Sequence, residues 1–295
     1  MRAEETVLSD VHLHAHADAP TTFVWRYPSL LGALDADGDR VVKRRRRMGE
    51  LEEEDDFGAK YTLSLHHSLA TTLADVGLQV WQGALVLGDL LVSQPTLVEA
   101  ATVLELGGGC GLCGLLAVRL CAERVFITDT GDGVLQNAGR NVSDNGCTER
   151  AHVRRLDWTA PWPPVLSEAG DMFEWNARDL EALRSSAMIL AADVVYDDAL
   201  TDAFVSRLVE LLRWLRGGRC THSPFCLMGT ERRINFCVDS LSTRAPAQDH
   251  FFAQLAQKGL DYEPIPLADV PQAFEYSRSK ELRLYRIRLA EEHYR

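Results

Sequence analysis

Apolar residues recur along most of the chain in two patterns, which predict strands and helices in alternation. Predicted strands occupy 60–65, 101–106, 124–129, 151–158, 186–196, 223–231 and 280–289. The run at 186–196 is nearly continuously apolar, as expected for a strand covered on both faces. Apolar residues at helical spacing occupy 80–92, 111–122, 132–146, 199–218 and 250–259. Strands that alternate with helices of this length predict a doubly wound, mostly parallel α/β sheet.

The C-terminal part of the chain departs from this alternation. After the last helix, the stretch 260–289 contains a strand-like piece, an irregular stretch with prolines, and a closing strand. We therefore expect a β-hairpin at the edge of the sheet, with one strand antiparallel to the others. Dinucleotide-binding domains do not usually end in this way.

The first sixty residues have a pattern of their own. His12, His14 and His16 alternate with apolar or small residues in "VHLHAHAD". A half-buried strand alternates in the same way, and no further ligand cluster lies near in the sequence, so we predict no bound metal. The "DADGD" at 35–39 predicts a turn, and therefore a β-hairpin near Thr22–Val42.

Two blocks of opposite charge follow, "KRRRR" at Lys43–Arg47 and "ELEEEDD" at Glu50–Asp56. Such charge density predicts a flexible, solvated loop over 43–56. The basic block equally fits a nuclear import signal, so we expect a nuclear protein that can also be cytoplasmic. The acidic block can mask that signal or bind a basic client. We take 1–59 as an extension and 60–295 as the main domain.

The segment 159–186 is longer than a typical connection and contains three prolines. We interpret it as an insert at the ligand-bearing edge of the sheet, where such loops often carry function. Its apolar residues Met172, Phe173 and Trp175 can line a substrate groove, although ordinary burial is the favoured reading.

Composition narrows the function classes. The 295 residues carry a formal net charge of −12. This acidity argues against a nucleic-acid-binding protein and favours a small-molecule substrate or a basic protein partner. No uncharged run approaches the roughly 20 residues of a membrane span, and the first ten residues lack the apolar core of a signal peptide. Seven cysteines without paired spacing indicate a reduced, intracellular chain. We expect a monomer.

The stretch "VLELGGGCGLCG" at 103–114 satisfies two cofactor patterns. The dinucleotide pattern G-x-G-x-x-G comprises Gly109, Gly111 and Gly114. The G-x-G-x-G pattern of S-adenosylmethionine enzymes comprises Gly107, Gly109 and Gly111. Asp129, at the end of the next predicted strand, suits both patterns because it can accept hydrogen bonds from ribose hydroxyls. Cys110 and Cys113 form C-x-x-C but lack partner ligands, so we read them as packing residues.

Glu105 favours the second pattern. It lies two residues before the first glycine, where its carboxylate would repel a pyrophosphate and attract an ammonium or sulfonium group. Asp157 and Trp158 follow the third strand of the domain and can hold an adenine by its amino group and its ring face. Asp193 and Tyr196, in "DVVY", place a carboxylate and a phenol at the carboxyl end of the next strand.

Together these residues resemble the seven-β-strand methyltransferases and, within them, methyltransferase family 16, which consists mostly of protein-lysine methyltransferases. The resemblance covers about 60–288. Its motifs are "VWQGALVLGDLL", the glycine loop, "ITD" at 127–129, "LDW" at 156–158 and "DVVYDDAL" at 193–200. It implies a Rossmann-like, seven-stranded doubly wound sheet with a closing antiparallel hairpin. Gly108 departs from the usual G-A-G of the family, and we expect it to loosen the loop slightly.

The resemblance also implies residue roles for S-adenosyl-L-methionine. The implied cofactor-binding residues are Trp81, Glu105, Gly107, Gly109, Gly111, Asp129, Asp157, Trp158 and Ala192. The implied catalytic residues are Asp193 and Tyr196, facing the methyl-transfer site. The reaction would be in-line attack by a neutral lysine amine, with S-adenosyl-L-homocysteine as product. On this reading, Asp193→Ala should leave cofactor binding nearly intact and abolish turnover.

The implied substrate is a lysine of a non-histone, nuclear, basic client protein. Two alternatives stay open at this point. One is methylation of nucleic acid or a small molecule, although the N-P-P-Y/F motif of amino-group methylation of nucleic acids is replaced by "DVVY". The other is an NAD-dependent oxidoreductase that uses the dinucleotide pattern of the loop.

Overall fold

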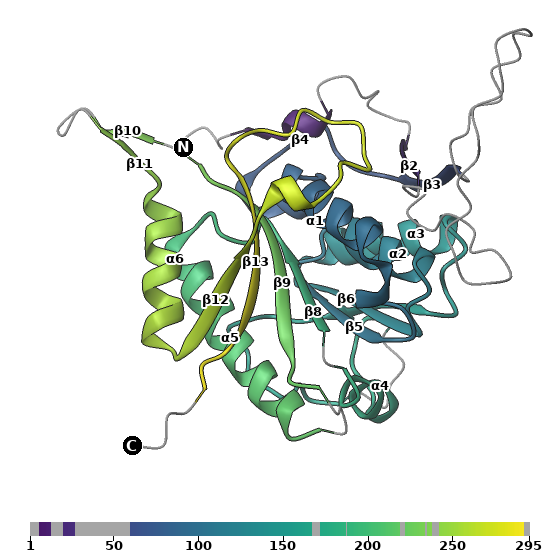
Figure 1. Ribbon diagram of the computed structural model, residues 1–295. Coiled ribbons are helices and arrows are strands. Elements are labelled where there is room, and N and C mark those ends of the chain that lie inside the picture. Colours follow the sequence, from purple (N-terminus) through teal and green to yellow (C-terminus); the bar gives the residue numbers. More distant parts are fainter. Residues whose placement is uncertain are drawn as a thin grey trace, which may run out of the picture.

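A computed structural model of the chain describes residues 6–12, 20–26, 60–166, 172–186, 188–218, 222–233, 235–237 and 242–291. Its central element is one seven-stranded sheet in the order β12-β13-β9-β8-β5-β6-β7 (Figure 1). The strands are β5 Thr102–Leu106, β6 Arg124–Asp129, β7 Ala151–Arg155, β8 Met188–Ala192, β9 Phe225–Glu231, β12 Leu260–Ile265 and β13 Leu282–Leu289.

The strand directions confirm the predicted sheet. The pairs among β5, β6, β7, β8 and β9 are parallel, whereas β13 runs antiparallel to both of its neighbours, β9 and β12. The C-terminal hairpin therefore closes the sheet as expected, with β13 inserted beside β9 and β12 left at the edge.

Helices cover both faces of the sheet (Figure 1). They are α1 Gln82–Ser93, α2 Leu112–Arg119, α3 Asp132–Asp144, α4 Ala177–Leu183, α5 Asp198–Arg216 and α6 Pro246–Gln257. Two apolar clusters result, one with α1, α2 and α3 and the other with α5 and α6. Successive residues of a strand point to opposite faces of the sheet, so Val103 packs in the first cluster and Leu104 in the second. This period of two, with a cluster on each face, explains why the central strands β5 and β8 are almost entirely apolar.

Helix α1 is largely buried, with nine of its twelve residues inside the fold. Leu73–Ser93, which combines a 3-10 segment with α1, is long and apolar enough by length and composition to cross a membrane. Most of it is buried within the fold, where α1 packs on β9, β13 and α2. Core helices of soluble proteins have the same composition, so this property is weak evidence for a membrane span.

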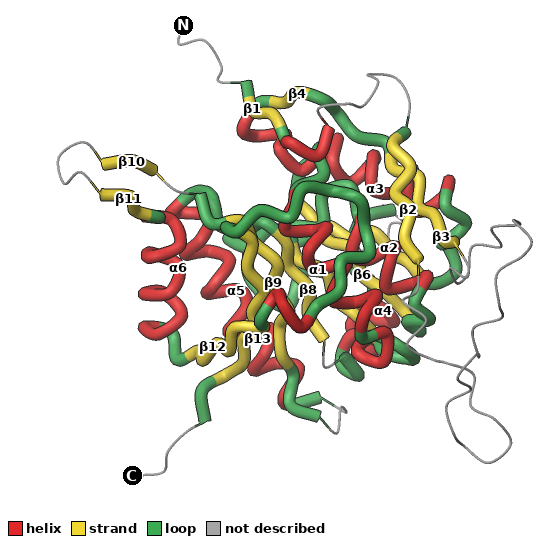
Figure 2. The backbone as a smooth tube through the Cα atoms, turned by 45° about the horizontal axis from the view of Figure 1, so that its top comes forward, coloured by secondary structure: helices red, strands yellow, loops and turns green. Residues whose placement is uncertain are grey.

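The N-terminal residues pair with strands that lie outside the central sheet (Figure 2). β1 Val7–Leu8 pairs with β4 Ala70–Thr71, and β2 Thr21–Arg26 pairs antiparallel with β3 Lys60–Leu65. The β-hairpin predicted near Thr22–Val42 was therefore wrong in its partner strand, because Thr21–Arg26 pairs with Lys60–Leu65. The predicted turn at 35–39 lies outside the described residues. The charge blocks, His14 and His16 also lie outside them.

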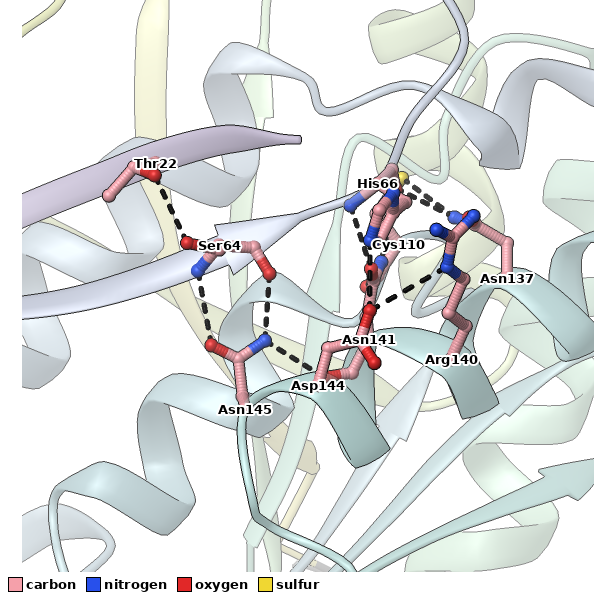
Figure 3. A network of polar contacts seen from close by, with 9 residues as sticks. All are labelled: Thr22, Ser64, His66, Cys110, Asn137, Arg140, Asn141, Asp144 and Asn145. Carbon is pink, nitrogen blue, oxygen red and sulfur yellow. Dashed lines mark hydrogen bonds and ion pairs between the residues drawn. The ribbon is translucent and has the colours of Figure 1, made fainter. Parts of the chain in front are cut away.

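Asparagine side chains attach β3 to helix α3 (Figure 3). Asn141 accepts the His66 backbone N–H at 2.7 Å and donates to the carbonyl oxygens of His66 and Cys110 at 3.1 and 3.0 Å. Asn145 makes the same two-way contact with Ser64, at 3.0 and 2.7 Å. Because Cys110 belongs to the glycine loop, this network connects the N-terminal strands to the loop.

The segment 159–186 contains a helix that the sequence reading missed. Asn176 and Asp179 form a capping box at the start of α4, and Asp179 also accepts from Arg154 at 2.7 Å. Thr159 is the one described residue of this segment that lines the main cavity. The segment then crosses to the amino end of β5, where Ser186 Oγ donates to the Thr102 carbonyl. Trp175 is fully buried, whereas Met172 is exposed.

Candidate active site

A cavity of about 250 Å³ lies at the carboxyl ends of β5, β6 and β8. This is the edge at which ligands bind in open parallel sheets. Its wall includes every predicted site residue except Gly111: Trp81, Glu105, Gly107, Gly109, Asp129, Asp157, Trp158, Ala192, Asp193 and Tyr196. Residues far apart in the sequence therefore meet around one cavity.

The glycine loop follows β5 and needs glycine for two reasons. Gly107 and Gly109 have φ values of +61° and +53°, which other residues rarely adopt. A Cβ at Gly109 would also lie 2.7 Å from the carbonyl oxygen of Gly77. Gly111, with φ of +83°, caps helix α2 behind the cavity wall. It shapes the loop without facing the cavity.

Gly108 is more tightly held than the sequence suggested. Its N–H donates to the Thr128 carbonyl at 2.8 Å. A Cβ at this position would lie 2.7 Å from Cγ2 of Ile127 and 3.1 Å from Oε2 of Glu105. These neighbours would have to shift to admit a larger residue, whereas the effect of Gly108 on the looseness of the loop stays a prediction.

Glu105 lies beneath the loop and is only 3% exposed. Its Oε2 accepts the N–H of Gly114, one of the free donors in the first turn of α2, at 3.0 Å. Burial raises the pKa of this carboxyl to about 8, and the nearby Asp129 adds to the rise. A Cβ at Gly114 would lie 2.5 Å from that Oε2 and 2.6 Å from Cγ1 of Ile127. Gly114 thus permits close packing of helix on strand.

Asp129 ends β6 and faces the loop. Its Oδ2 accepts the N–H of Gly109 at 3.0 Å, and its Oδ1 accepts the N–H of Thr130 at 2.8 Å. Burial raises the pKa of Asp129 despite these hydrogen bonds. The same carboxylate can still accept from a ligand hydroxyl, since each oxygen has a second lone pair.

Asp157 and Trp158 form the wall beyond β7. Asp157 is exposed, and its Oδ1 accepts from the hydroxyl and the N–H of Thr159 at 2.7 and 2.8 Å. These hydrogen bonds lower its pKa, so it is ionised at neutral pH. Trp158 is half-buried and packs edge-to-face on Phe204, with 5.3 Å between ring centroids. The six-membered ring of Trp158 borders Gly107, since a Cβ there would lie 3.1 Å from its Cζ2.

Trp81 immediately precedes α1 as its N-cap residue. Its indole Nε1 donates to the Val76 carbonyl at 3.0 Å, which fixes the ring at the cavity wall. The guanidinium of Arg233 lies over the same ring, 5.5 Å from its centroid.

Asp193 holds three elements together. It follows β8 with φ of +51°, an uncommon value for a residue other than glycine. Its Oδ2 accepts the N–H of Gly83 in α1 at 2.6 Å, and its Oδ1 accepts the N–H of Glu231 at the end of β9 at 2.8 Å. Burial raises its pKa. This carboxylate has a structural role as well as a place in the cavity wall.

Tyr196 also lines the cavity, and its phenol makes no hydrogen bond within the described part of the chain. Burial raises its pKa, with further contributions from Asp129 and Asp197, so the phenol is neutral at physiological pH. A neutral phenol at a cavity wall can accept one hydrogen bond and donate another.

The electrostatics of the cavity favour a cationic ligand. Glu105, Asp129, Asp157 and Asp193 line it, and its described wall contains no lysine, arginine or histidine. A pyrophosphate would meet four carboxyl groups and no counter-ion. An ammonium or sulfonium group would offset the cost of burying the acidic side chains.

Comparison with known proteins agrees with this chemistry. The family model described as lysine methyltransferase matches residues 60–258. This chain belongs to that family. Methyltransferase-like protein 22 of Homo sapiens is 34% identical over 292 residues, covering 86% of this chain and 70% of that protein. The protein-lysine N-methyltransferase EEF2KMT of Homo sapiens is 25% identical over 246 residues, covering 79% and 65%.

The chain is therefore an S-adenosylmethionine-dependent protein-lysine N-methyltransferase, and the oxidoreductase reading is set aside. In this lysine methyltransferase, the sequence reading missed one side of the cavity. Leu73, Val76 and Gly77, from the 3-10 segment before α1, line it together with Ala84. These residues are apolar or small and carry no chemical signal. Gly83 was missed too, although a Cβ there would lie 2.5 Å from the Asp193 carboxyl.

Proposed function

We propose that the main cavity binds S-adenosyl-L-methionine and that the enzyme methylates a lysine of a non-histone, nuclear client protein. The observation that supports the cofactor site most strongly is the meeting of the glycine loop, Asp129, Trp158 and the buried Glu105 at one cavity without cationic residues. Such a wall suits a ligand that carries an ammonium and a sulfonium group.

Each part of the cavity then has a role toward the cofactor. Gly107 and Gly109 let the backbone approach the methionine part, and Glu105 faces its ammonium. Asp129 accepts from the ribose hydroxyls, Asp157 accepts from the adenine amino group, and Trp158 covers the adenine ring. Trp81 and Ala192 supply further contacts from the cavity wall, and Gly111 contributes by shaping the glycine loop.

The bound cofactor supplies an activated methyl group, so the protein contributes alignment and exclusion of water. The acceptor lysine needs more help, because its ordinary pKa of about 10.4 leaves little neutral amine at pH 7. Desolvation lowers the pKa of an amine as it enters the cavity. Tyr196 and the free lone pairs of Asp193 can accept its N–H groups and direct its lone pair toward the methyl carbon.

The client is proposed from charge and from the basic block. A net charge of −12 favours a basic protein over nucleic acid as partner. "KRRRR" at Lys43–Arg47 fits nuclear import, with a cytoplasmic pool before import. We propose that the enzyme acts as a monomer and away from membranes.

Labelled methyl transfer into separately fractionated nuclear and cytoplasmic extracts tests this proposal. Tyr196→Phe serves as the low-activity variant, since it keeps the ring and removes the hydroxyl. We expect label on lysine of a nuclear protein, with much less label from the variant. Label in RNA, or in cytoplasmic proteins alone, would contradict the proposal.

A further inference from the structure

A second cavity, of about 220 Å³, adjoins the candidate active site. Four residues of the N-terminal segment, Val7 to Asp10, form one side of it. Trp81 and Gln82 at the start of α1, and Glu231 and Arg233 after β9, complete the wall. Trp81 also lines the main cavity and is the single residue common to the two walls within the described part of the chain. Trp81 therefore lies between the two cavities.

Asp193 provides a second connection between them. It lines the main cavity, while its Oδ1 accepts the N–H of Glu231 at 2.8 Å and its Oδ2 accepts the N–H of Gly83 at 2.6 Å. Glu231 itself lines the second cavity, and Gln82 precedes Gly83. The second cavity thus begins beside the group that we place at the methyl-transfer site. A lysine side chain, with its four-carbon stem, is suited to reach from one cavity into the other.

The N-terminal segment is built into this site. Ser9 donates its backbone N–H to Oε1 of Gln79 at 2.7 Å, and its hydroxyl donates to the Val80 carbonyl at 2.5 Å. Gln79 in turn donates to the Val7 carbonyl at 2.9 Å. Because these hydrogen bonds anchor Val7 to Ser9 next to Trp81, they fix Asp10 at the rim of the second cavity.

The described wall of the second cavity carries two acidic residues and one basic residue. Asp10 is exposed at its rim, and Glu231 is half-buried and accepts the Ser279 hydroxyl on its Oε1 at 3.2 Å, its one side-chain hydrogen bond within the described part of the chain. The side-chain oxygen of Gln82 is buried and has no hydrogen-bond donor among the described residues. Arg233 is the one cationic residue of the described wall, and its guanidinium already occupies a face of Trp81. The face of a tryptophan ring attracts a cation through a cation–π interaction.

From this arrangement we propose that the second cavity is the protein-substrate site. The target lysine passes along Trp81 into the main cavity, and basic residues beside it in the client pair with Asp10 and Glu231. Arg233 moves away from the Trp81 ring when the client segment binds. The substrate class is a lysine within a basic segment. This inference rests on the proposed function, and it gives the N-terminal extension a part in substrate binding.

Conjugates of the cofactor product provide a test that does not need the natural client. In them, a nitrogen replaces the sulfur of S-adenosylhomocysteine and is joined by two carbons to the lysine Nε of a tripeptide, either Arg-Lys-Arg or Gly-Lys-Gly. Calorimetry gives the Kd of each conjugate and of S-adenosylhomocysteine for the full chain. At low salt, we expect the Arg-Lys-Arg conjugate to bind about tenfold more tightly than the Gly-Lys-Gly conjugate. Each of its two partly exposed ion pairs should lower the Kd about threefold. The preference should shrink at high salt.

Variants separate charge recognition from damage to the fold. The double variant Asp10→Asn with Glu231→Gln should lose the preference for the basic conjugate and keep its affinity for S-adenosylhomocysteine. Arg233→Gln, in the same wall, should increase the preference because it removes the competing cation. Glu123→Gln should leave the preference for the basic conjugate unchanged. It neutralises an exposed acid at the amino end of β6, whereas the cavity lies at the carboxyl ends of the strands.

The outcomes also separate the two proposals. If S-adenosylhomocysteine does not bind to the wild-type chain, the proposed function fails. If it binds but the basic conjugate shows no preference, or the double variant retains the preference, the substrate site lies elsewhere. If Arg233→Gln reduces the preference as the acidic variants do, charge at this wall does not govern recognition and the inference is wrong.

Discussion

Replacing Asp193 with alanine should weaken the fold as well as the activity. From the sequence alone, Asp193→Ala was expected to spare cofactor binding. The structure shows that the carboxylate accepts the N–H of Gly83 at 2.6 Å and the N–H of Glu231 at 2.8 Å. Gly83 lies in the first turn of α1, where backbone donors have no partner within the helix. Alanine would leave both donors without their acceptor.

The magnitude follows from these two contacts. Loss of the partner of a buried N–H costs about 1–3 kcal/mol, and the lower part of that range applies at a cavity wall. Asp193→Ala should therefore lower the free energy of unfolding by about 2–4 kcal/mol. Asp193→Asn should lose about half as much, since its single amide oxygen can still accept one of the two N–H groups. Both variants should lose methyl transfer.

Urea unfolding, followed by circular dichroism, measures these differences, and calorimetry with S-adenosylhomocysteine measures the cofactor site. Alanine should also weaken binding of S-adenosylhomocysteine, because Trp81 and Ala84 at the start of α1 line the main cavity. Asp197→Ala is the matched control. Asp197 caps α5 with one exposed hydrogen bond, to the Leu200 N–H at 2.9 Å, and its loss should cost about 1 kcal/mol. If Asp193→Ala unfolds no more easily than Asp197→Ala, the structural role assigned to Asp193 is wrong.

Two further predictions concern Glu105 and Asn141. The pKa of Glu105 is raised from about 4.5 to about 8 in the ligand-free fold. The free energy of unfolding should therefore fall as the pH rises through this interval, because only the unfolded chain releases the proton easily. In Glu105→Gln, the free energy of unfolding should depend less on pH over the same interval. A ligand ammonium favours the ionised carboxyl, so affinity for S-adenosylhomocysteine should rise between pH 6 and 8 by at most about tenfold per unit, and a flat profile would contradict the contact. Asn141→Ala removes the acceptor of the His66 N–H and the donor to Cys110, and should cost about 2–3 kcal/mol in urea unfolding. The half-buried Asn137 only donates, to the His66 carbonyl and the Cys110 sulfur, so Asn137→Ala should cost less, and equal losses would count against the role assigned to Asn141.

The strands and the glycine loop could be predicted from sequence because their signals are local. Strand β5 is buried at every position, so its residues form a continuous apolar run. Gly107 and Gly109 need positive φ values, and a backbone requirement of this kind selects glycine. Asp129 ends β6 and Asp193 immediately follows β8, the two strands on either side of β5, and each acidic residue visibly interrupts an apolar run.

Other features depend on contacts between distant residues and left no such signal. Strand β2 pairs with β3 beyond the turn residues at 35–39, and the pairing buries Trp25, whose ring lies 5.9 Å from that of Phe274. Local turn signals could not indicate this partner. Likewise, Gly77 borders the loop only because the chain before α1 folds against Gly109. Such apolar or small residues have no chemistry that identifies them as part of a site.

The central claim is that the main cavity binds the cofactor, and calorimetric titration with S-adenosylhomocysteine tests it most directly. Ala84→Phe is the variant of choice, since it adds a large ring at the cavity wall from a helical position that tolerates side chains. We predict one S-adenosylhomocysteine per wild-type chain, unchanged binding by Glu123→Gln, and loss of binding by Ala84→Phe with its unfolding transition retained. Wild-type affinity in a folded Ala84→Phe variant would contradict the account.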